Sequence, residues 1–196
     1  MNLIIILCGG KGTRMNSDIP KVLHKVKGKS MLIRIVESSL KTNPDKIVLV
    51  VNPLNKQAII NELFEHNYMT HHIHLILQKE SKGTGHAIQC CFDFLLNYKD
   101  HQIIILNGDV PFIREETIQK LNNKKSNIVV SELENPVCYG RIVVNDNNDF
   151  EDIIEEKDCN DRERKVDLVN SGIYSFKTEP ILNNICKITN NNKQYE

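Results

Sequence analysis

A glycine-rich stretch early in the chain carries three basic residues close together. Residues 8–12 read Cys-Gly-Gly-Lys-Gly, and the basic residues are Lys11, Arg14 and Lys21. Glycines let backbone N–H groups approach an anion closely, and successive N–H groups form a nest for phosphate. Because the stretch directly follows the apolar run Leu3–Leu7, we expect it at the carboxyl edge of a parallel sheet, where α/β folds bind ligands. This pattern favours the binding of a polyphosphate.

Two common phosphate-binding loops can be excluded by position. A Walker A loop needs a glycine five positions before its Gly-Lys-Ser end, and Leu23 stands five positions before Gly28. A dinucleotide-binding fingerprint needs a third glycine after Gly10 and Gly12, and Met15 stands there. The loop therefore belongs to another class of phosphate site.

The first two thirds of the chain alternate between apolar runs and helical periodicity. We expect helices around Leu32–Leu40 and Ile59–Phe64 and from Thr84 onward, each with one apolar face. Strands buried on both faces read as continuous apolar runs, and four such runs occur, at Leu3–Leu7, Lys46–Val51, Ile73–Leu77 and Gln102–Leu106. Strands that alternate with helices predict βαβ units and an α/β fold with a mainly parallel sheet.

The pattern changes after about residue 126. Strands are expected at Ile128–Leu133, Gly140–Val144, Asp149–Glu155 and Val166–Phe176, with a helix starting near Thr178. This part is less regular and more antiparallel than the first. We therefore predict a single domain over 1–196, with a nucleotide-binding half at about 1–125 and a second half at about 126–196. The polar end, residues 189–196, has no closing element, so we expect either that the domain is truncated there or that this tail is disordered.

Composition narrows the class of protein. Of the 196 residues 40% are hydrophobic and 26% charged, and the 25 basic and 25 acidic residues cancel. A nucleic-acid binder or a polybasic membrane binder usually carries a basic excess, so neither is expected. No apolar run approaches the roughly 20 residues of a membrane span. The six cysteines show no CxxC spacing and no export signal is evident, which favours a cytoplasmic protein. The sequence leaves open whether it forms a homo-oligomer.

Several motifs occur together in a characteristic order. The chain resembles the nucleotide-sugar pyrophosphorylases, and within them the uridyltransferase domain of bacterial N-acetylglucosamine-1-phosphate uridyltransferases. The resemblance covers nearly the whole chain. The matching segments are Gly10–Met15, Pro20–His24, Gln78 with Gly83–Ala87, Asn107–Pro111, Tyr139–Ile142, Glu155 with Lys157 and Asp158, Asn170–Ile173 and Thr189–Asn192.

The resemblance implies a fold and a reaction. The fold would be a Rossmann-like, three-layer nucleotidyltransferase fold with a mixed, mainly parallel central sheet. The reaction would be the Mg²⁺-dependent formation of UDP-N-acetylglucosamine and pyrophosphate from UTP and N-acetylglucosamine 1-phosphate. The bacterial enzymes also carry an acetyltransferase domain of hexapeptide repeats. This sequence has no such repeats, so acetyl transfer is not expected.

Three residues are expected to be catalytic by the same resemblance. Arg14, with Lys11, would hold the β- and γ-phosphates that leave as pyrophosphate. Lys21 would contact the phosphates at the reacting centre, and Asp109 would hold the magnesium ion. From the residues alone, Lys21 could equally be a solvated surface lysine and Asp109 part of an ordinary turn.

The binding residues fall into two groups. Gln78 would read the edge of uracil, because its amide both donates and accepts hydrogen bonds. From the residues alone, Gln78 could be a polar strand end and Thr84 a helix cap. The full nucleotide-binding set is Leu7, Cys8, Gly9, Gly10, Lys11, Gly12, Thr13, Gln78, Gly83 and Thr84. The sugar-binding set is Gly140, Glu155 and Asn170, for which residue type alone favours structural roles.

The sequence departs from the family at two places. Cys8 and Gly9 replace the usual pair of alanines, and Gly9 is closer to hexose-1-phosphate guanylyl- and thymidylyltransferases. The alternatives are therefore the same chemistry with another hexose 1-phosphate or nucleotide, or a non-catalytic nucleotide-sugar-binding protein. The family's domain also continues beyond residue 196, with an asparagine that helps hold the metal. Cys8 itself is expected to be a small buried residue, with sensitivity to thiol reagents as the alternative.

Overall fold

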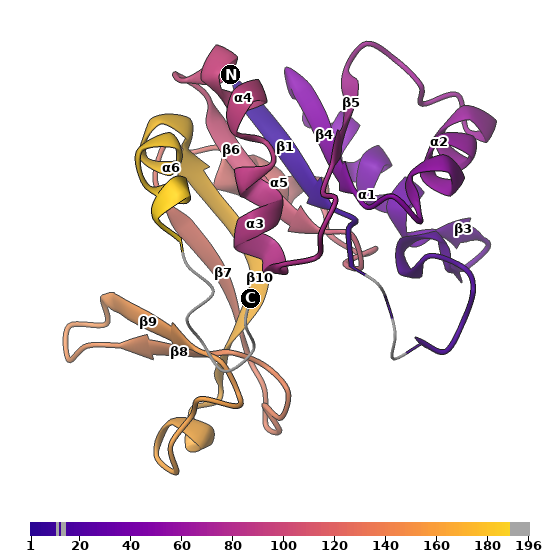
Figure 1. Cartoon of the computed structure of the whole chain (residues 1–196). Helices are drawn as coiled ribbons and strands as arrows, with labels where there is room; N and C mark the ends of the chain where they lie inside the picture. The colour runs from indigo at the N-terminus through magenta and orange to yellow at the C-terminus, as the bar shows by residue number, and fades with distance from the viewer. Residues whose placement is uncertain (11, 13–14, 189–196) are drawn as a thin grey trace.

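The computed structural model describes residues 1–10, 12 and 15–188 (Figure 1). Its centre is an eight-stranded sheet in the order β5-β4-β1-β6-β10-β8-β9, with β7 also paired to β10. A separate two-stranded ribbon is formed by β2 (Lys25–Val26) and β3 (Lys29–Ser30). The strands of the large sheet are β1 (Asn2–Leu7), β4 (Lys46–Val51), β5 (Ile73–Leu77), β6 (Gln102–Asn107), β7 (Asn127–Glu132), β8 (Arg141–Val144), β9 (Phe150–Ile154) and β10 (Leu168–Lys177).

The sheet is mixed. Strand β1 is paired in parallel with β4 on one side and with β6 on the other, and β4 is paired in parallel with β5. Strand β10 runs antiparallel to β6, β7 and β8, and β8 runs antiparallel to β9. The parallel strands come from the first part of the chain and the antiparallel ones from the second. Both the fold class and the more antiparallel second part are confirmed.

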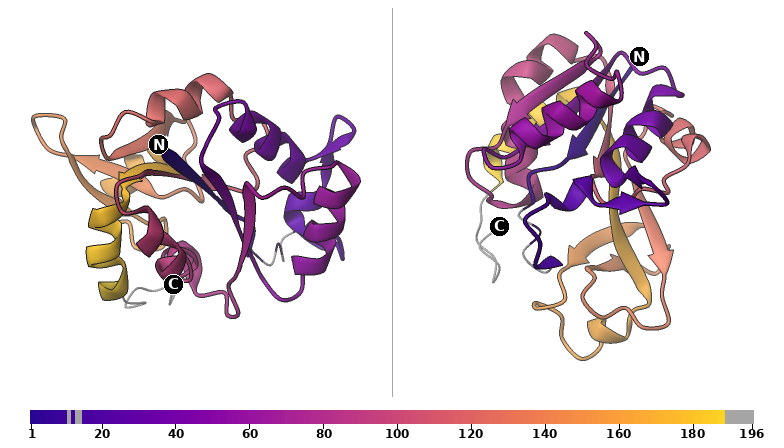
Figure 2. Two further views of the ribbon diagram at one scale, coloured as in Figure 1. Left: turned by 90° about the horizontal axis from the view of Figure 1, so that it is seen from above. Right: turned by 90° about the vertical axis from the view of Figure 1, so that its right-hand side faces the viewer.

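Helices cover both faces of the sheet (Figures 1 and 2). Alternate residues of β1 point to opposite faces, so Ile4 and Ile6 pack in one core and Leu3 and Ile5 in the other. The first core includes side chains of α1, α2 and α5, and the second includes side chains of α3, α4 and α6. The helices are α1 (Met31–Leu40), α2 (Lys56–Glu65), α3 (Gly83–Gln89), α4 (Phe92–Leu95), α5 (Glu115–Leu121) and α6 (Thr178–Asn184). The result is a three-layer α/β arrangement.

Short 3-10 turns join these elements, and one of them matters for the site. It spans Lys21–Leu23 (η2) and buries Val22 against the core. The others are η3 (Leu96–Tyr98), η4 (Glu163–Lys165) and η5 (Ile185–Lys187).

The strand predictions were the most accurate ones. Lys46–Val51 and Ile73–Leu77 match β4 and β5 residue for residue, because buried parallel strands are continuous apolar runs. The helical face proposed for Ile59–Phe64 was wrong at its last member: Ile59 is buried, but Phe64 is 72% exposed. The helix expected from Thr84 is divided into α3 and α4.

The second half of the chain extends away from the helices. In Figure 1, β7 and β10 run down to a lower part of the molecule that is formed by β8, β9 and η4. The pairing of β10 with β7 is irregular between Asn170 and Ile173. Gly172 lies inside this irregularity with φ +72°, a conformation that glycine adopts without steric cost. A Cβ at this position would lie 2.1 Å from Nδ2 of Asn107, so the bend lets β10 approach the end of β6 closely.

Candidate active site

The carboxyl ends of β1 and β6 lie side by side. The Gly108 amide donates a hydrogen bond to the Leu7 carbonyl at 2.9 Å. A Cβ on Gly108 would lie 2.7 Å from the Leu7 oxygen and 2.7 Å from Cγ1 of Val22. Only glycine fits this contact without displacing a neighbour. Gly108 therefore brings three segments to one edge of the sheet: the loop after β1, the turn η2 and Asp109.

Lys21 and Asp109 form an ion pair at this edge. The Lys21 Nζ contacts Oδ2 of Asp109, and the two side chains are 40% and 36% exposed. Gly12 lies against Lys21 from the loop side with φ +61°, and a Cβ on Gly12 would lie 2.9 Å from Cβ of Lys21. The structure thus places two of the three expected catalytic residues together beside the glycine-rich loop. The third, Arg14, lies outside the described residues, as do Lys11 and Thr13.

Two buried asparagines hold the glycine-rich loop, and sequence reasoning missed both. Asn55 donates from Nδ2 to the Cys8 carbonyl at 2.7 Å, and Asn52 donates from Nδ2 to the Gly9 carbonyl at 3.0 Å. Asn55 also accepts from the Asn52 amide at 2.9 Å. Both side chains are buried, so their bonds replace water for loop carbonyls that would otherwise lack a partner. The detectable signal was two asparagines flanking Pro53 directly after a buried strand.

The Gln78 side chain is buried against the same loop. Its Nε2 donates to the Gly83 carbonyl at 3.1 Å and lies 3.2 Å from Nδ1 of His86. Its Oε1 would lie 2.4 Å from a Cβ added to Gly9. Gln78 therefore lies against the loop after β1, although the two segments are far apart in the sequence. Gly83 begins α3 with φ +86°.

The remaining nucleotide-binding candidates differ in exposure. Gly10 and Thr84 are exposed, and Leu7 is half-buried. The reading of Thr84 as a helix cap was wrong, because Lys82 holds the N-cap position of α3 and Thr84 lies within the helix.

Cys8 is a buried residue of the loop, as expected. Only 1% of it is exposed, and its amide donates to the Val50 carbonyl at 2.8 Å. Burial, with a smaller contribution from the negative charge of Asp109, raises the pKa of the Cys8 thiol to about 12. Because the thiolate is the nucleophile, Cys8 is a packing residue rather than a reactive one.

The three sugar-binding candidates lie together in the lower part of the molecule. The Asn170 amide donates to the Gly140 carbonyl at 2.9 Å. A Cβ on Gly140 would lie 3.3 Å from Oε1 of Glu155. The Asn170 side chain bonds within its own strand, donating from Nδ2 to the Tyr174 hydroxyl at 2.6 Å and accepting from the Gly172 amide at 2.9 Å.

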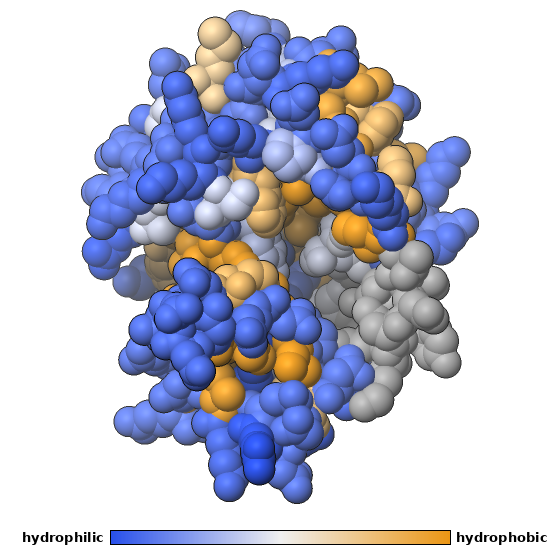
Figure 3. Space-filling model, turned by 90° about the vertical axis from the view of Figure 1, so that its left-hand side faces the viewer, coloured by the Kyte–Doolittle hydropathy of each residue, from blue (hydrophilic) through white to orange (hydrophobic). Residues whose placement is uncertain are grey.

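Arg141 stabilises the backbone beside these candidates. Its side chain is 1% exposed and pairs with Glu156 at 2.7 Å, and its Nη1 donates to the Tyr139 carbonyl. Arg164 pairs with the other carboxylate oxygen of Glu156 at 2.9 Å. Buried arginine is normally paired in this way. Seen from the left-hand side of Figure 1, the molecular surface is mostly hydrophilic, with apolar side chains around the recess between the upper and lower parts (Figure 3).

The donor chemistry of the edge suits a magnesium ion that is bound partly by substrate. Among the described residues no group of three or more His, Cys, Asp or Glu side chains could hold a metal. Mg²⁺ commonly takes only one or two protein carboxylates, with phosphate oxygens and water as its other ligands. Asp109 offers one carboxylate beside a loop suited to phosphate, so the residues present fit this type of binding.

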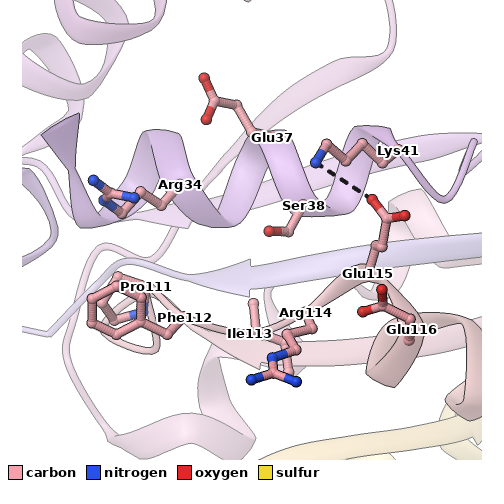
Figure 4. Close-up of a pocket in the computed structure, with 10 residues that line it drawn as sticks. All are labelled: Arg34, Glu37, Ser38, Lys41, Pro111, Phe112, Ile113, Arg114, Glu115 and Glu116. Carbon is pink, nitrogen blue, oxygen red and sulfur yellow. Dashed lines mark ion pairs between the residues drawn. The ribbon is translucent and has the colours of Figure 1, made fainter.

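A separate cavity of about 700 Å³ lies between α1 and the segment Pro111–Glu116. Figure 4 shows Lys41 and Glu115 pointing toward one another across it, and their ion-pair distance is 3.5 Å. At its other end the Arg34 guanidinium lies 5.8 Å from the centre of the Phe112 ring. Arg34 also donates to the carbonyls of Val26 and Lys27. Lys41, Glu115 and Arg34 are therefore already paired with other groups of the protein.

The architecture and the edge of the sheet define a class of protein. The sequence pattern of the family described as "Nucleotidyl transferase" matches residues 3–196. The chain therefore belongs to the nucleotidyl transferase family. None of the helices within the described residues is long and apolar enough to cross a membrane.

Two curated relatives are similar to this chain over nearly its whole length. The chain is 42% identical over 199 residues to a protein of Acanthamoeba polyphaga mimivirus named "Probable UDP-N-acetylglucosamine pyrophosphorylase", covering 98% of this chain and 77% of the relative. It is 38% identical over 202 residues to the "Bifunctional protein GlmU" of a Picosynechococcus species, covering 100% of this chain and 44% of the relative. The chain thus spans less than half of that bifunctional relative.

Solved structures show the same fold. A UDP-glucose pyrophosphorylase complexed with UDP-glucose superimposes with a TM-score of 0.77 at 17% identity, covering 100% of this chain and 83% of that one. HddC from Yersinia pseudotuberculosis superimposes with a TM-score of 0.68 at 24% identity, covering 93% and 80%. At these identities the likeness concerns the fold, which is Rossmann-like.

Proposed function

We propose that the chain is a sugar-1-phosphate nucleotidyltransferase that forms UDP-N-acetylglucosamine and pyrophosphate from UTP and N-acetylglucosamine 1-phosphate. The name of the viral relative, at 42% identity over 98% of this chain, supports the choice of product. The observation that carries the proposal is the pairing of Lys21 with Asp109 at the edge where the glycine-rich loop begins. A cation and a carboxylate at such an edge serve phosphate transfer between two anionic substrates.

The reaction needs no covalent intermediate on the protein. A phosphate oxygen of the sugar phosphate forms a bond to the α-phosphorus of UTP, and the bond from that phosphorus to the bridging β-oxygen breaks. Pyrophosphate leaves with the electron pair of that bond. Catalysis then consists of positioning and charge stabilisation, since both reactants are anions.

Different residues of the chain provide the positioning and the charge stabilisation. Lys21 stabilises negative charge at the reacting phosphates, and the backbone of the loop after β1 holds the nucleotide. Lys11 and Arg14 hold the β- and γ-phosphates. Asp109 holds a magnesium ion, which neutralises phosphate charge when bound. Both side chains of the pair are partly exposed, which leaves them accessible to substrate phosphates and to a metal ion.

Two separate groups of residues select the nucleotide and the sugar. Gln78, Gly83, Thr84 and the backbone of Leu7–Gly10 contact the base and ribose. Gly140, Glu155 and Asn170 contact the sugar. The cluster of these last three in the lower part of the molecule supports the assignment, because residues from separate strands converge there.

A substrate panel tests the proposal. Pyrophosphate release is measured for UTP, CTP, TTP and GTP, each with N-acetylglucosamine 1-phosphate, glucose 1-phosphate or mannose 1-phosphate, in the presence of Mg²⁺. We expect the fastest release from UTP with N-acetylglucosamine 1-phosphate, and none after addition of a chelator. Faster release with another pair would replace the substrate assignment. Binding of UTP without release from any pair would contradict the enzymatic function.

A further inference from the structure

The Gln78 amide has only one consistent orientation. The Gly83 carbonyl is a pure acceptor and lies 3.1 Å from one end of the amide. That end must therefore be the nitrogen, because an oxygen there would repel the carbonyl. The same nitrogen lies 3.2 Å from Nδ1 of His86, so its second hydrogen points at the ring. Both hydrogens of the amide are then used inside the protein.

The His86 ring completes this arrangement. If Nδ1 accepts from Gln78, the ring proton lies on Nε2. That nitrogen faces Sγ of Cys90, 3.9 Å away, one turn further along the chain. His86 lies in α3 and is half-buried, so its position is set by the helix rather than by a loose loop. The histidine thus provides the acceptor that Gln78 needs.

The other end of the amide faces the glycine-rich loop. A Cβ on residue 9 would lie only 2.4 Å from Oε1 of Gln78, so glycine at this position leaves room for the oxygen. No described residue donates a hydrogen bond to this oxygen. Gln78 is only 4% exposed, and the part of its amide that lies beside the loop is this acceptor oxygen and not a donor.

We propose that His86 is a positioning residue that fixes Gln78 with its carbonyl oxygen toward the base, so that the site selects bases with a ring N–H. Uracil carries a hydrogen on N3 and can donate to Oε1, whereas N3 of cytosine carries none and would meet the oxygen as a second acceptor. Without His86 the amide keeps only its hydrogen bond to the Gly83 carbonyl, so its oxygen is held less firmly toward the base. The inference rests on the proposed function for the identity of the nucleotide.

The test compares UTP with CTP in three variants. His86→Leu removes the acceptor, His86→Asn retains an oxygen near the place of Nδ1, and His74→Leu is a matched control. His74 lies on β5 and packs against Phe94, with ring centres 5.2 Å apart, away from Gln78. For each variant the dissociation constants of UTP and CTP are measured by calorimetry, and KM and kcat by pyrophosphate release. Thermal melting verifies folding.

We expect His86→Leu to lower the preference for UTP over CTP about tenfold, mostly by raising KM for UTP. The kcat and the KM for the sugar phosphate should change less than about twofold. His86→Asn should restore most of the preference, and His74→Leu should leave it unchanged. A folded His86→Leu protein with the preference of the unmodified chain would overturn the inference.

The binding measurements keep the two proposals apart. A chain that releases no pyrophosphate but prefers UTP in a His86-dependent way would contradict the enzymatic function and support the role of His86. A chain that turns over UTP with the same base preference in all variants would support the enzymatic function and contradict the role of His86. Failure to bind UTP at all would overturn both.

Discussion

Lys21 and Asp109 are joined in an ion pair, although each is expected to face a phosphate or a metal during the reaction. Exposed ion pairs contribute little to stability, about 0–1 kcal/mol, and these two side chains are 40% and 36% exposed. Their proximity therefore matters for catalysis far more than for folding.

Lys21→Ala and Asp109→Asn should each lower kcat for pyrophosphate release by at least about a hundredfold, because each removes a charge that acts at the transition state. Melting temperatures should stay within about 3 °C of the unmodified chain. Lys41→Ala is the matched control: its side chain is 68% exposed and pairs with Glu115 outside the site. Full turnover by Lys21→Ala would remove Lys21 from the catalytic set.

Cys8 should be inert to alkylation at neutral pH. Its thiol pKa is raised to about 12 by burial and by Asp109, so almost no thiolate exists at pH 7. Iodoacetamide should label the exposed Cys138 and Cys186 first, without loss of turnover. Peptide mass spectrometry after partial labelling verifies this order. Early labelling of Cys8, with parallel loss of activity, would mean that the loop opens.

Among the elements, the loop after β1 depends on the residues that follow β4. Asn55 bonds both the Cys8 carbonyl and the Asn52 amide, and all of these groups are buried. Removing one side chain thus leaves two polar groups without partners. A buried unsatisfied polar group costs about 1–3 kcal/mol.

Asn55→Ala should lower the melting temperature by about 5 °C or more and raise KM for UTP, because the loop carbonyls lose their anchor. Asn97→Ala is the control, since Asn97 is exposed and makes only two 3.5 Å contacts to backbone carbonyls. If both variants melted at the same temperature, the loop would be held by other contacts.

Helix α1 is tied to its surroundings through Glu37. Burial alone would raise the pKa of Glu37, but hydrogen bonds from Lys29 and Tyr68 and the charge of Lys29 outweigh it, and the pKa is lowered from 4.5. A carboxyl group with a lowered folded pKa stabilises the protein above its unfolded pKa. That stabilisation is lost as the pH falls through the folded pKa.

Glu37→Gln should therefore lower the melting temperature by about 2 °C at pH 7, and the difference should shrink as the pH falls below the ordinary pKa of 4.5 and through the lowered folded pKa. Calorimetric melting of both proteins between pH 3 and pH 7 measures this. A difference that stayed constant across the range would show that Glu37 contributes through packing rather than charge.

At the level of the whole molecule, what could be predicted depended on burial. Strands β4 and β5 were located residue for residue because parallel strands covered by helices are uninterrupted apolar runs. Helix α5 was missed because only Ile118 and Leu121 of its seven residues are buried, too few for a periodic signal. The β2–β3 ribbon has two residues per strand and carries no pattern at all.

The residues of the site were likewise predictable only where residue type and order carry a signal in the sequence. The glycine-rich loop, Lys21 and Asp109 were proposed from residue type and order, and the structure places Lys21 against Asp109. Asn52 and Asn55 were not proposed, because their roles arise from contacts with a loop more than 40 positions away in the sequence. His86 was not proposed either, because its contact with Gln78, eight positions earlier, crosses from the end of β5 to α3 and follows no helical or strand spacing. Buried polar residues that support a loop have no spacing of their own, so only the folded chain reveals them.

The most direct test follows the transferred phosphorus. The chain is incubated with UTP labelled in the α-phosphate, N-acetylglucosamine 1-phosphate and Mg²⁺, and the labelled products are separated. Nucleotidyl transfer predicts that the label moves into UDP-N-acetylglucosamine with one pyrophosphate released for each product molecule. Label that remains in UTP, or that is found in UMP whether or not the sugar phosphate is present, would contradict it.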